Sequence, residues 1–158
     1  MAEAGNIGAI AAQASEANGY DVAQTTTPNA DGSETIDNKA FNANGSLASE
    51  TTSTTSADGL SETISFDTTG NGVFDRTQTD VSVNNADGST TQTVGDYNAA
   101  KDLLDSKVTT TSADGNVVTI ARDLDGGGIV QQTETRQTLA GGGSLDTLTN
   151  LNSDTLSP

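Results

Sequence analysis

A nine-residue stretch near the middle of the chain has oxygen-bearing side chains at a spacing that suits a hard cation. Residues 67–75 read DTTGNGVFD, with such side chains at positions 1, 3, 5 and 9 and a glycine at position 6. Calcium takes roughly six to eight oxygen ligands, and a glycine permits the sharp turn that gathers them. The candidate metal ligands are Asp67, Thr69, Asn71, the backbone carbonyl of Val73, and Asp75.

This ligand set is incomplete compared with an EF-hand loop. The bidentate glutamate expected at position 12 is absent, and Gln78 stands there. A bound calcium ion would therefore need water or a neighbouring strand to complete its shell. The alternative is an Asx-type turn that closes a hairpin, for which Asp, Asn and Gly are equally suited.

A second stretch of the same kind lies further along the chain. Residues 123–131 read DLDGGGIVQ, so Asp123 and Asp125 supply carboxylates, but position 5 is glycine and position 9 is Gln131. With so few oxygens, this copy is expected to be either a plain turn or a calcium site of roughly millimolar affinity.

The two stretches belong to a longer internal repeat. The sequence TTSADG at residues 54–59 recurs at 110–115, and NADGS at 29–33 recurs at 85–89. The offset of 56 residues holds without a gap from about residue 29 to about residue 136. Such self-similarity indicates a repeat architecture.

Turn signals divide each repeat into shorter segments. Asp-Gly, Asn-Gly or a glycine cluster recurs mostly every 13 to 16 residues, and in one such slot, residues 99–101, the glycine is missing. The segments between them are rich in Thr, Ser and Val, which favours strands, and Asp-Gly or Asn-Gly between strands favours hairpins. The predicted fold is therefore all-β. Tandem antiparallel β-hairpin repeats, each unit 56 residues long, are expected to form an elongated meander or a solenoid-like array.

The repeat predicts a division of the chain into four parts. Residues 1–28 are expected to be an N-terminal linker or short helix, 29–84 repeat 1, 85–140 repeat 2, and 141–158 a partial repeat or tail. Residues 25–28 are interpreted as linker, and residues 102–108 could include a turn of helix. The leucine spacing after residue 144 fits either a short helix or a partial repeat.

Few apolar residues are available to form a core. The chain is 32% hydrophobic and 3% aromatic, a composition that together with a high net charge also fits disorder. Regular turns and β-branched alternation favour a folded sheet instead. Ile64 and Phe66 share one face of a strand and Val81 and Val83 share one face of another, so these residues are expected to pack in a shallow core.

Charge and composition exclude several classes of function. A net charge of −16 repels nucleic acid and anionic membranes, and residues 5–17 are too short and weakly apolar to insert into a membrane. The chain has neither Cys nor His. A Ser-His-Asp triad is therefore impossible, and no glycine stretch is a phosphate-binding loop. The chain is not expected to be an enzyme, and the partners that such an acidic surface favours are cations.

The alternation of SADG, DTTGNGVFD and NADGS over about residues 29–145 resembles the tandem repeats of large secreted bacterial surface proteins, the RTX-type adhesins and calcium-binding array proteins. That family commonly has more Asp in this loop, and Thr69 and Gly127 depart from its pattern. The resemblance implies export to the cell surface or medium, folding linked to calcium, and a spacer or adhesive role.

The expected function is accordingly a structural or adhesive repeat module, stiffened by calcium and able to assemble into fibres with neighbouring repeats or copies of itself. The alternative is a binding module for ice or carbohydrate on a threonine-rich strand face, formed by residues such as Thr133 and Thr135. Charges at Asp80, Glu134 and Arg136 interrupt the threonine runs and argue against that alternative.

Overall fold

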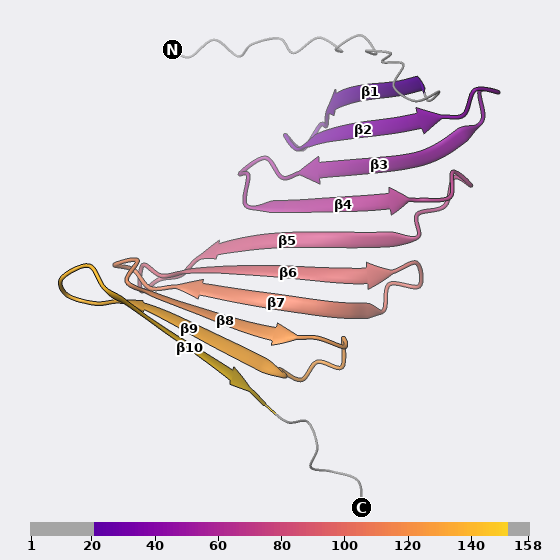
Figure 1. Cartoon of the computed structure of the whole chain (residues 1–158). Coiled ribbons are helices and arrows are strands. Elements are labelled where there is room, and N and C mark those ends of the chain that lie inside the picture. The colour runs from indigo at the N-terminus through magenta and orange to yellow at the C-terminus, as the bar shows by residue number, and fades with distance from the viewer. Residues whose placement is uncertain (1–20, 152–158) are drawn as a thin grey trace, which may run out of the picture. The chain divides into compact units, whose positions relative to one another are not determined.

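The computed structural model describes residues 21–151, and the regular structure in that range consists of ten β-strands (Figure 1). These are β1 (Asp21–Pro28), β2 (Glu34–Phe41), β3 (Leu47–Thr55), β4 (Ser61–Asp67), β5 (Arg76–Asn84), β6 (Thr90–Asn98), β7 (Leu103–Thr111), β8 (Val117–Asp123), β9 (Gln132–Thr138) and β10 (Ser144–Asn150). Neighbouring strands are antiparallel and follow one another in sequence order. The prediction of an all-β meander of hairpins is confirmed.

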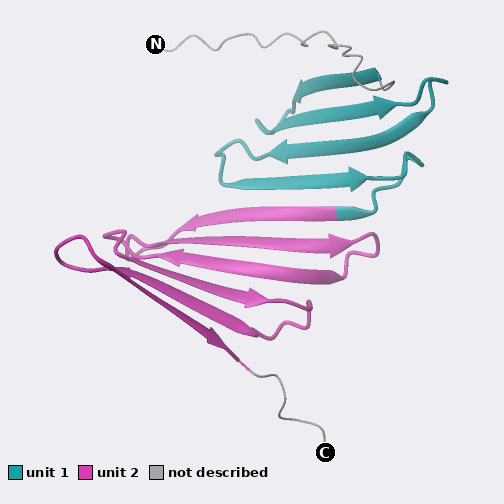
Figure 2. Ribbon diagram, in the orientation of Figure 1, with its two compact units in different colours: residues 1–76 teal, residues 77–158 magenta. Residues whose placement is uncertain are grey.

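The chain divides into two compact units (Figure 2). Unit 1 spans residues 1–76 and includes β1 to β4; unit 2 spans residues 77–158 and includes nearly all of β5 together with β6 to β10. Within each unit the strands form a single sheet. The predicted boundary between repeat 1 and repeat 2, between residues 84 and 85, falls at the turn after β5. The division between the two compact units falls earlier, at the start of β5.

The sequence repeat is also a repeat of structure. Strands β2, β3 and β4 recur as β6, β7 and β8 at the same offset. Even the irregularity recurs, because the register shifts between Ala40 and Phe41 opposite Leu47, and again between Asp96 and Tyr97 opposite Leu103. The same sequence pattern therefore forms the same local backbone twice.

The Asp-Gly signals form short hydrogen-bonded hairpin turns. In the turn between β1 and β2, the Asn29 N–H donates to the Ser33 carbonyl at 2.8 Å and the Gly32 N–H donates to the Asn29 carbonyl at 3.1 Å. The Asp31 carboxylate then accepts from both the N–H and the hydroxyl of Ser33, at 3.0 and 2.7 Å. The turn at residues 85–89 has the same hydrogen bonds, as the sequence repeat requires.

Two local expectations are wrong. Residues 25–28, interpreted as linker, form the end of β1, and residues 103–108 are strand from the outset, without a helical turn. Of the two alternatives for the leucines after residue 144, the helix is wrong, because Leu145 and Leu148 lie in strand β10. In each case strand pairing with a neighbour overrides a weak local helix or linker signal. The rest of the segment expected to be an N-terminal linker or short helix, residues 1–20, lies outside the described residues.

The expected apolar core is also absent from the described residues. Between residues 21 and 151 no hydrophobic side chain is buried, and Val81 and Val83 are 42% and 50% exposed. A single layer of strands has no second layer to cover either face, so apolar side chains pack only against neighbours on the same sheet. Phe66, for example, lies beneath the Arg76 guanidinium, whose central carbon is 6.0 Å from the ring centroid.

Candidate cation-binding loops and threonine rungs

The two candidate calcium stretches form the long loops that follow β4 and β8. Asp67, the last residue of β4, is 1% exposed and is the most deeply buried side chain in the described part of the chain. Its Oδ1 accepts from the Gly70 N–H at 2.7 Å and the Thr69 N–H at 3.1 Å, while its Oδ2 accepts from the Gly72 N–H at 2.7 Å. The backbone of the loop is thus folded around this carboxylate.

The hydrogen bonds of the loop also stabilise the charge on Asp67. Burial raises the pKa of this carboxyl, but the N–H groups of Gly72, Thr69 and Gly70 donate to the charged form and together outweigh burial. The net pKa lies below the ordinary value of 3.8, so Asp67 is ionised at neutral pH. Its oxygens face hydrogen-bond donors.

The other predicted ligands in this loop are engaged in the same way. The Thr69 hydroxyl donates to Asp67 Oδ1 at 3.1 Å, and Asn71 Oδ1 accepts from the Val73 N–H at 2.8 Å. Asp75 Oδ2 accepts from both the N–H and the hydroxyl of Thr68, at 2.8 and 2.7 Å. These oxygens fit a hydrogen-bonded turn better than a calcium cage.

The second loop repeats this arrangement with different residues. Asp123 is 5% exposed, and its Oδ2 accepts from the Gly128 N–H at 2.7 Å. Asp125 Oδ1 accepts from the Gly127 N–H at 3.0 Å and from Gln131 Nε2 at 2.7 Å. Gln131 Oε1 in turn accepts from the Leu124 N–H at 2.6 Å.

Position 9 of the two loops therefore has a shared hydrogen-bonding role. Asp75 and Gln131 are equivalent in the repeat, and each accepts from the N–H of the residue after the buried aspartate, Thr68 or Leu124. An amide can replace a carboxylate as the acceptor of such a bond. From the sequence, Gln131 counts as a lost ligand; in the structure it keeps the turn closed.

The structure brings the predicted ligands into two separate loops, each centred on a buried aspartate. Among residues 21–151 there is no group of three or more Asp or Glu side chains arranged to hold a metal ion. Calcium binding stays a prediction, and it would require the loops to exchange several N–H···O bonds for metal contacts.

One feature of the loops was missed from the sequence. A Cβ added to Gly70 would lie 2.3 Å from the Leu47 carbonyl oxygen, and one added to Gly126 would lie 2.1 Å from the Leu103 oxygen. Each loop is therefore pressed against the first residue of the strand next to it, where only glycine fits. The available signal was the repeat, since Gly70 and Gly126 occupy equivalent positions in it.

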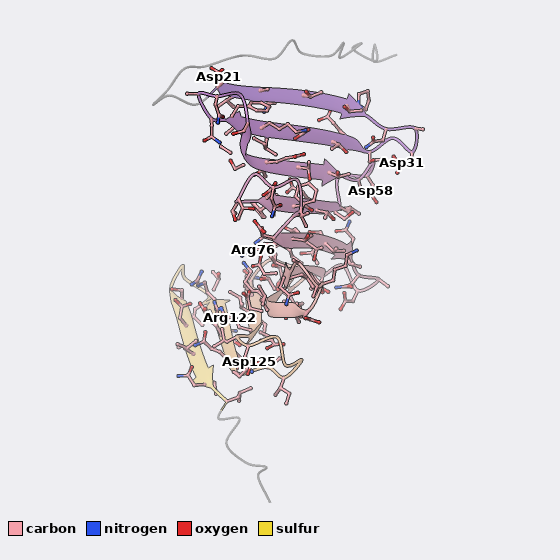
Figure 3. The ribbon with its side chains drawn as sticks, turned by 90° about the vertical axis from the view of Figure 1, so that its right-hand side faces the viewer. Asp21, Asp31, Asp58, Arg76, Arg122 and Asp125 are labelled. Atoms are coloured by element: carbon pink, nitrogen blue, oxygen red, sulfur yellow. The ribbon has the colours of Figure 1, made fainter. Side chains whose placement is uncertain are left out.

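A shallow hollow lies beside two turns of unit 1, lined in part by Asp31 and Asp58 (Figure 3). Its volume is about 460 Å³. The Asp58 carboxylate accepts from the Ser56 hydroxyl at 2.6 Å, just as the Asp31 carboxylate accepts from Ser33. Both carboxylates thus hold their own turns closed.

Threonines line up across the strands of each unit. We call residues that lie directly opposite one another on successive strands a rung. In unit 1 one rung consists of Thr27, Thr35, Thr54 and Thr63. In unit 2 the corresponding rung consists of Thr91, Thr110, Thr119, Thr135 and Thr147. Within the first rung the hydroxyls of Thr35 and Thr54 are 2.9 Å apart and share a hydrogen bond.

The charges that argued against a threonine face lie on the other side of the sheet. Glu134 and Arg136 alternate with Thr133 and Thr135 along β9, and successive side chains of a strand point to opposite faces. Arg122 of β8 (Figure 3) donates to Glu134 at 2.8 Å on that other face. The expectation that these charges interrupt the threonine surface is therefore wrong.

No protein-family model matches the chain, and no curated protein sequence matches it. None of the residues between 21 and 151 forms a helix that could span a bilayer. The resemblance to secreted calcium-binding repeats remains a prediction from the sequence.

Proposed function

We propose that the chain is a structural repeat module of a secreted or cell-surface bacterial protein, with a spacer or adhesive role. The observation that carries the proposal is the recurrence, at the offset of the sequence repeat, of the same strands, the same bulge and the same hydrogen-bonded loop. No hydrophobic side chain in the described residues is buried. Each hairpin is therefore stabilised mainly by pairing with its neighbours, as in other repeat architectures.

The ends of the array offer a route to extension. Among the described residues, β1 pairs with β2 alone and β10 pairs with β9 alone. An outer strand presents unpaired N–H and C=O groups that can pair with another strand. Further repeats, or copies of the chain, can pair with these outer strands. This supports a spacer or adhesive role, which depends on the length of the array and on its assembly.

Far-UV circular dichroism with thermal melting, first in excess EGTA and then in millimolar calcium, tests this function. The loop hydrogen bonds lead us to expect a cooperative β-sheet melt already in EGTA. If neither condition gave a β-sheet signal, the structural module would be refuted.

The calcium arm of the same experiment tests stiffening at the loops. If calcium raises the melting temperature, Asp75→Ala should abolish the increase, whereas Asp146→Ala, a matched loss of one carboxylate in β10, should preserve it. An increase that both variants retain would locate the calcium effect outside the first loop.

A further inference from the structure

Unit 2 has one sheet face without charge across its central rungs. The first rung is the threonine row of β6 to β10 described above. The second rung, two residues further along each strand, consists of Thr93, Val108, Ala121, Thr133 and Thr149. We call these ten side chains the neutral face.

Strand β5 extends the neutral face. Asp80 Oδ2 accepts from Gln92 Nε2 at 2.7 Å, and Gln92 alternates with Thr91 and Thr93 along β6. Asp80 therefore lies on the face opposite the threonines. Val81 and Val83 alternate with Asp80 in β5, so they lie on the same face as the threonines.

The opposite face of unit 2 is charged and internally paired. Arg122 lies 2.8 Å from Glu134, and Arg136 lies 3.1 Å from both Glu134 and Asp146. These ion pairs, of which Arg122–Glu134 and Arg136–Asp146 join neighbouring strands, are partly exposed and suit contact with water. In a chain with a net charge of −16, this segregation leaves one surface on which two copies can meet without opposing like charges.

Unit 1 provides an internal comparison. Its first rung is again all threonine, but its second rung consists of Thr25, Asp37, Thr52 and Ser65, and the next contains Lys39 and Glu50. Asp37 and Glu50 both pair with Lys39. The equivalent face of unit 1 is therefore charged two residues below its threonine rung.

We propose that the neutral face of unit 2 docks face to face against the same face of a second copy of this chain. A sheet normally buries one face against another layer, and the described residues of unit 2 form a single sheet that supplies no such layer. A patch that contacts its own copy about a twofold axis needs only to be complementary to itself. The neutral face meets this requirement, because its side chains are uncharged, short and mostly β-branched. The inference rests on the self-assembly in the proposed function and adds a sheet face to the strand edges as a second surface through which copies can meet.

The size of the face sets the expected strength of docking. Strands about 4.8 Å apart and rungs about 6.8 Å apart give a patch of roughly 400 Å² per copy across six strands. That is about half the area per partner of a standard stable interface. Docking should therefore be weak, with a dissociation constant in the micromolar range or above, and added salt should strengthen it by screening the net charge.

Sedimentation equilibrium of the full chain, at several protein and salt concentrations, tests the proposal. Thr119 lies at the centre of the first rung and is exposed. We expect Thr119→Lys and Thr119→Glu each to weaken association at least tenfold, because either charge would be desolvated at the interface. The matched controls are Thr63→Lys and Thr63→Glu, at the equivalent site of unit 1, and these should associate like the wild type.

Comparing a Lys and a Glu substitution at each site separates docking from a general effect of net charge. If only net charge mattered, Lys would strengthen association and Glu would weaken it, at both sites alike, and that pattern would overturn the proposal. Association indifferent to both Thr119 variants would assign self-assembly to the strand edges and overturn it too. A wild type that stays monomeric but gives a normal β-sheet melt would overturn docking while leaving the structural function intact.

The same variants also test whether the threonine face binds ice or carbohydrate instead of a second copy. If the wild type stays monomeric and slows ice recrystallisation, or binds a carbohydrate array, and Thr119→Lys loses that property, the face serves that ligand and the docking proposal is wrong. The docking proposal is supported if wild-type dimers form with rising protein concentration, are lost in both Thr119 variants and are kept in both Thr63 variants.

Discussion

At the scale of single residues, the glycines of the first long loop have different reasons for being glycine. Gly70 and Gly72 both have positive φ, 68° and 80°. Only Gly70 also meets the backbone of a neighbouring strand, at Leu47, whereas a Cβ at Gly72 would meet nothing within 4 Å. The two positions therefore separate backbone strain from close packing.

Gly70→Ala should cost considerably more than Gly72→Ala. A non-glycine residue in the left-handed region costs about 1–2 kcal/mol, which both variants incur. Gly70→Ala adds overpacking of about 1–3 kcal/mol, because the clash is with backbone that must move. Urea unfolding of both variants measures the difference, and equal losses would show that the loop can move off the strand without penalty.

Lys101 is the one described non-glycine residue with positive φ, at 68°. Its equivalent in the preceding repeat is Gly45, which has a φ of 81°, so the repeat retains the turn even where its glycine is missing. Lys101→Gly should therefore stabilise the chain by roughly 0.5–1 kcal/mol, since it removes the left-handed strain while adding some chain entropy. The reciprocal variant Gly45→Lys should destabilise it, and thermal melts of the two should shift in opposite directions.

At the scale of the element, each of the four short Asp-Gly turns is closed by an aspartate whose ionised form is preferred in the fold. Hydrogen bonds from the Ser112 hydroxyl, and then from the backbone and side-chain N–H groups of Asn116, lower the pKa of Asp114 from 3.8 to about 2. The pKa values of Asp31 and Asp87 are lowered by the hydroxyl and N–H of Ser33 and Ser89. Acid should therefore loosen the turns together.

The direction of the pH dependence follows from the lowered pKa values. A carboxyl with a lower pKa in the folded chain stabilises it fully above its unfolded pKa, and that stability is lost as pH falls through the folded value. The melting temperature should thus fall as pH drops from about 5 to 2. Asp114→Asn should melt lower than wild type at pH 7 and show a shallower fall, and a fall as steep as that of wild type would contradict the role of this carboxylate.

The elements could be predicted from the sequence because their signals are local and repeated. Asp-Gly turns mark the hairpins, and Thr- and Val-rich alternation marks the strands. The interior of the long loops could not be predicted, because an aspartate followed by Thr, Gly and Asn suits either a cation or a ring of backbone N–H groups. The error about Glu134 and Arg136 was avoidable, because they alternate with Thr133 and Thr135 along one strand and so lie on its other face. Strand register was hidden, and with it the alignment of threonines from successive strands into rungs.

At the scale of the molecule, the error about the core has a physical origin. Alternation along a strand shows that two faces differ, but it does not show that a second layer covers either of them. Ile64 and Phe66 therefore suggested a core, although they are only half-buried on a single sheet. The chain of 158 residues has the length of an ordinary domain, yet its described residues have no buried apolar side chain.

A sheet without a core should unfold with an unusually small heat-capacity change. Apolar exposure dominates this quantity, and an ordinary domain of this length would give about 2 kcal/mol/K. We expect about half that value or less for the dilute chain, from calorimetric enthalpies measured over a range of melting temperatures. The value should rise with protein concentration if copies dock through the neutral face, because docking adds buried apolar area. An ordinary heat-capacity change in a sample shown to be monomeric would mean that the isolated chain buries a core, and would contradict the single-layer sheet.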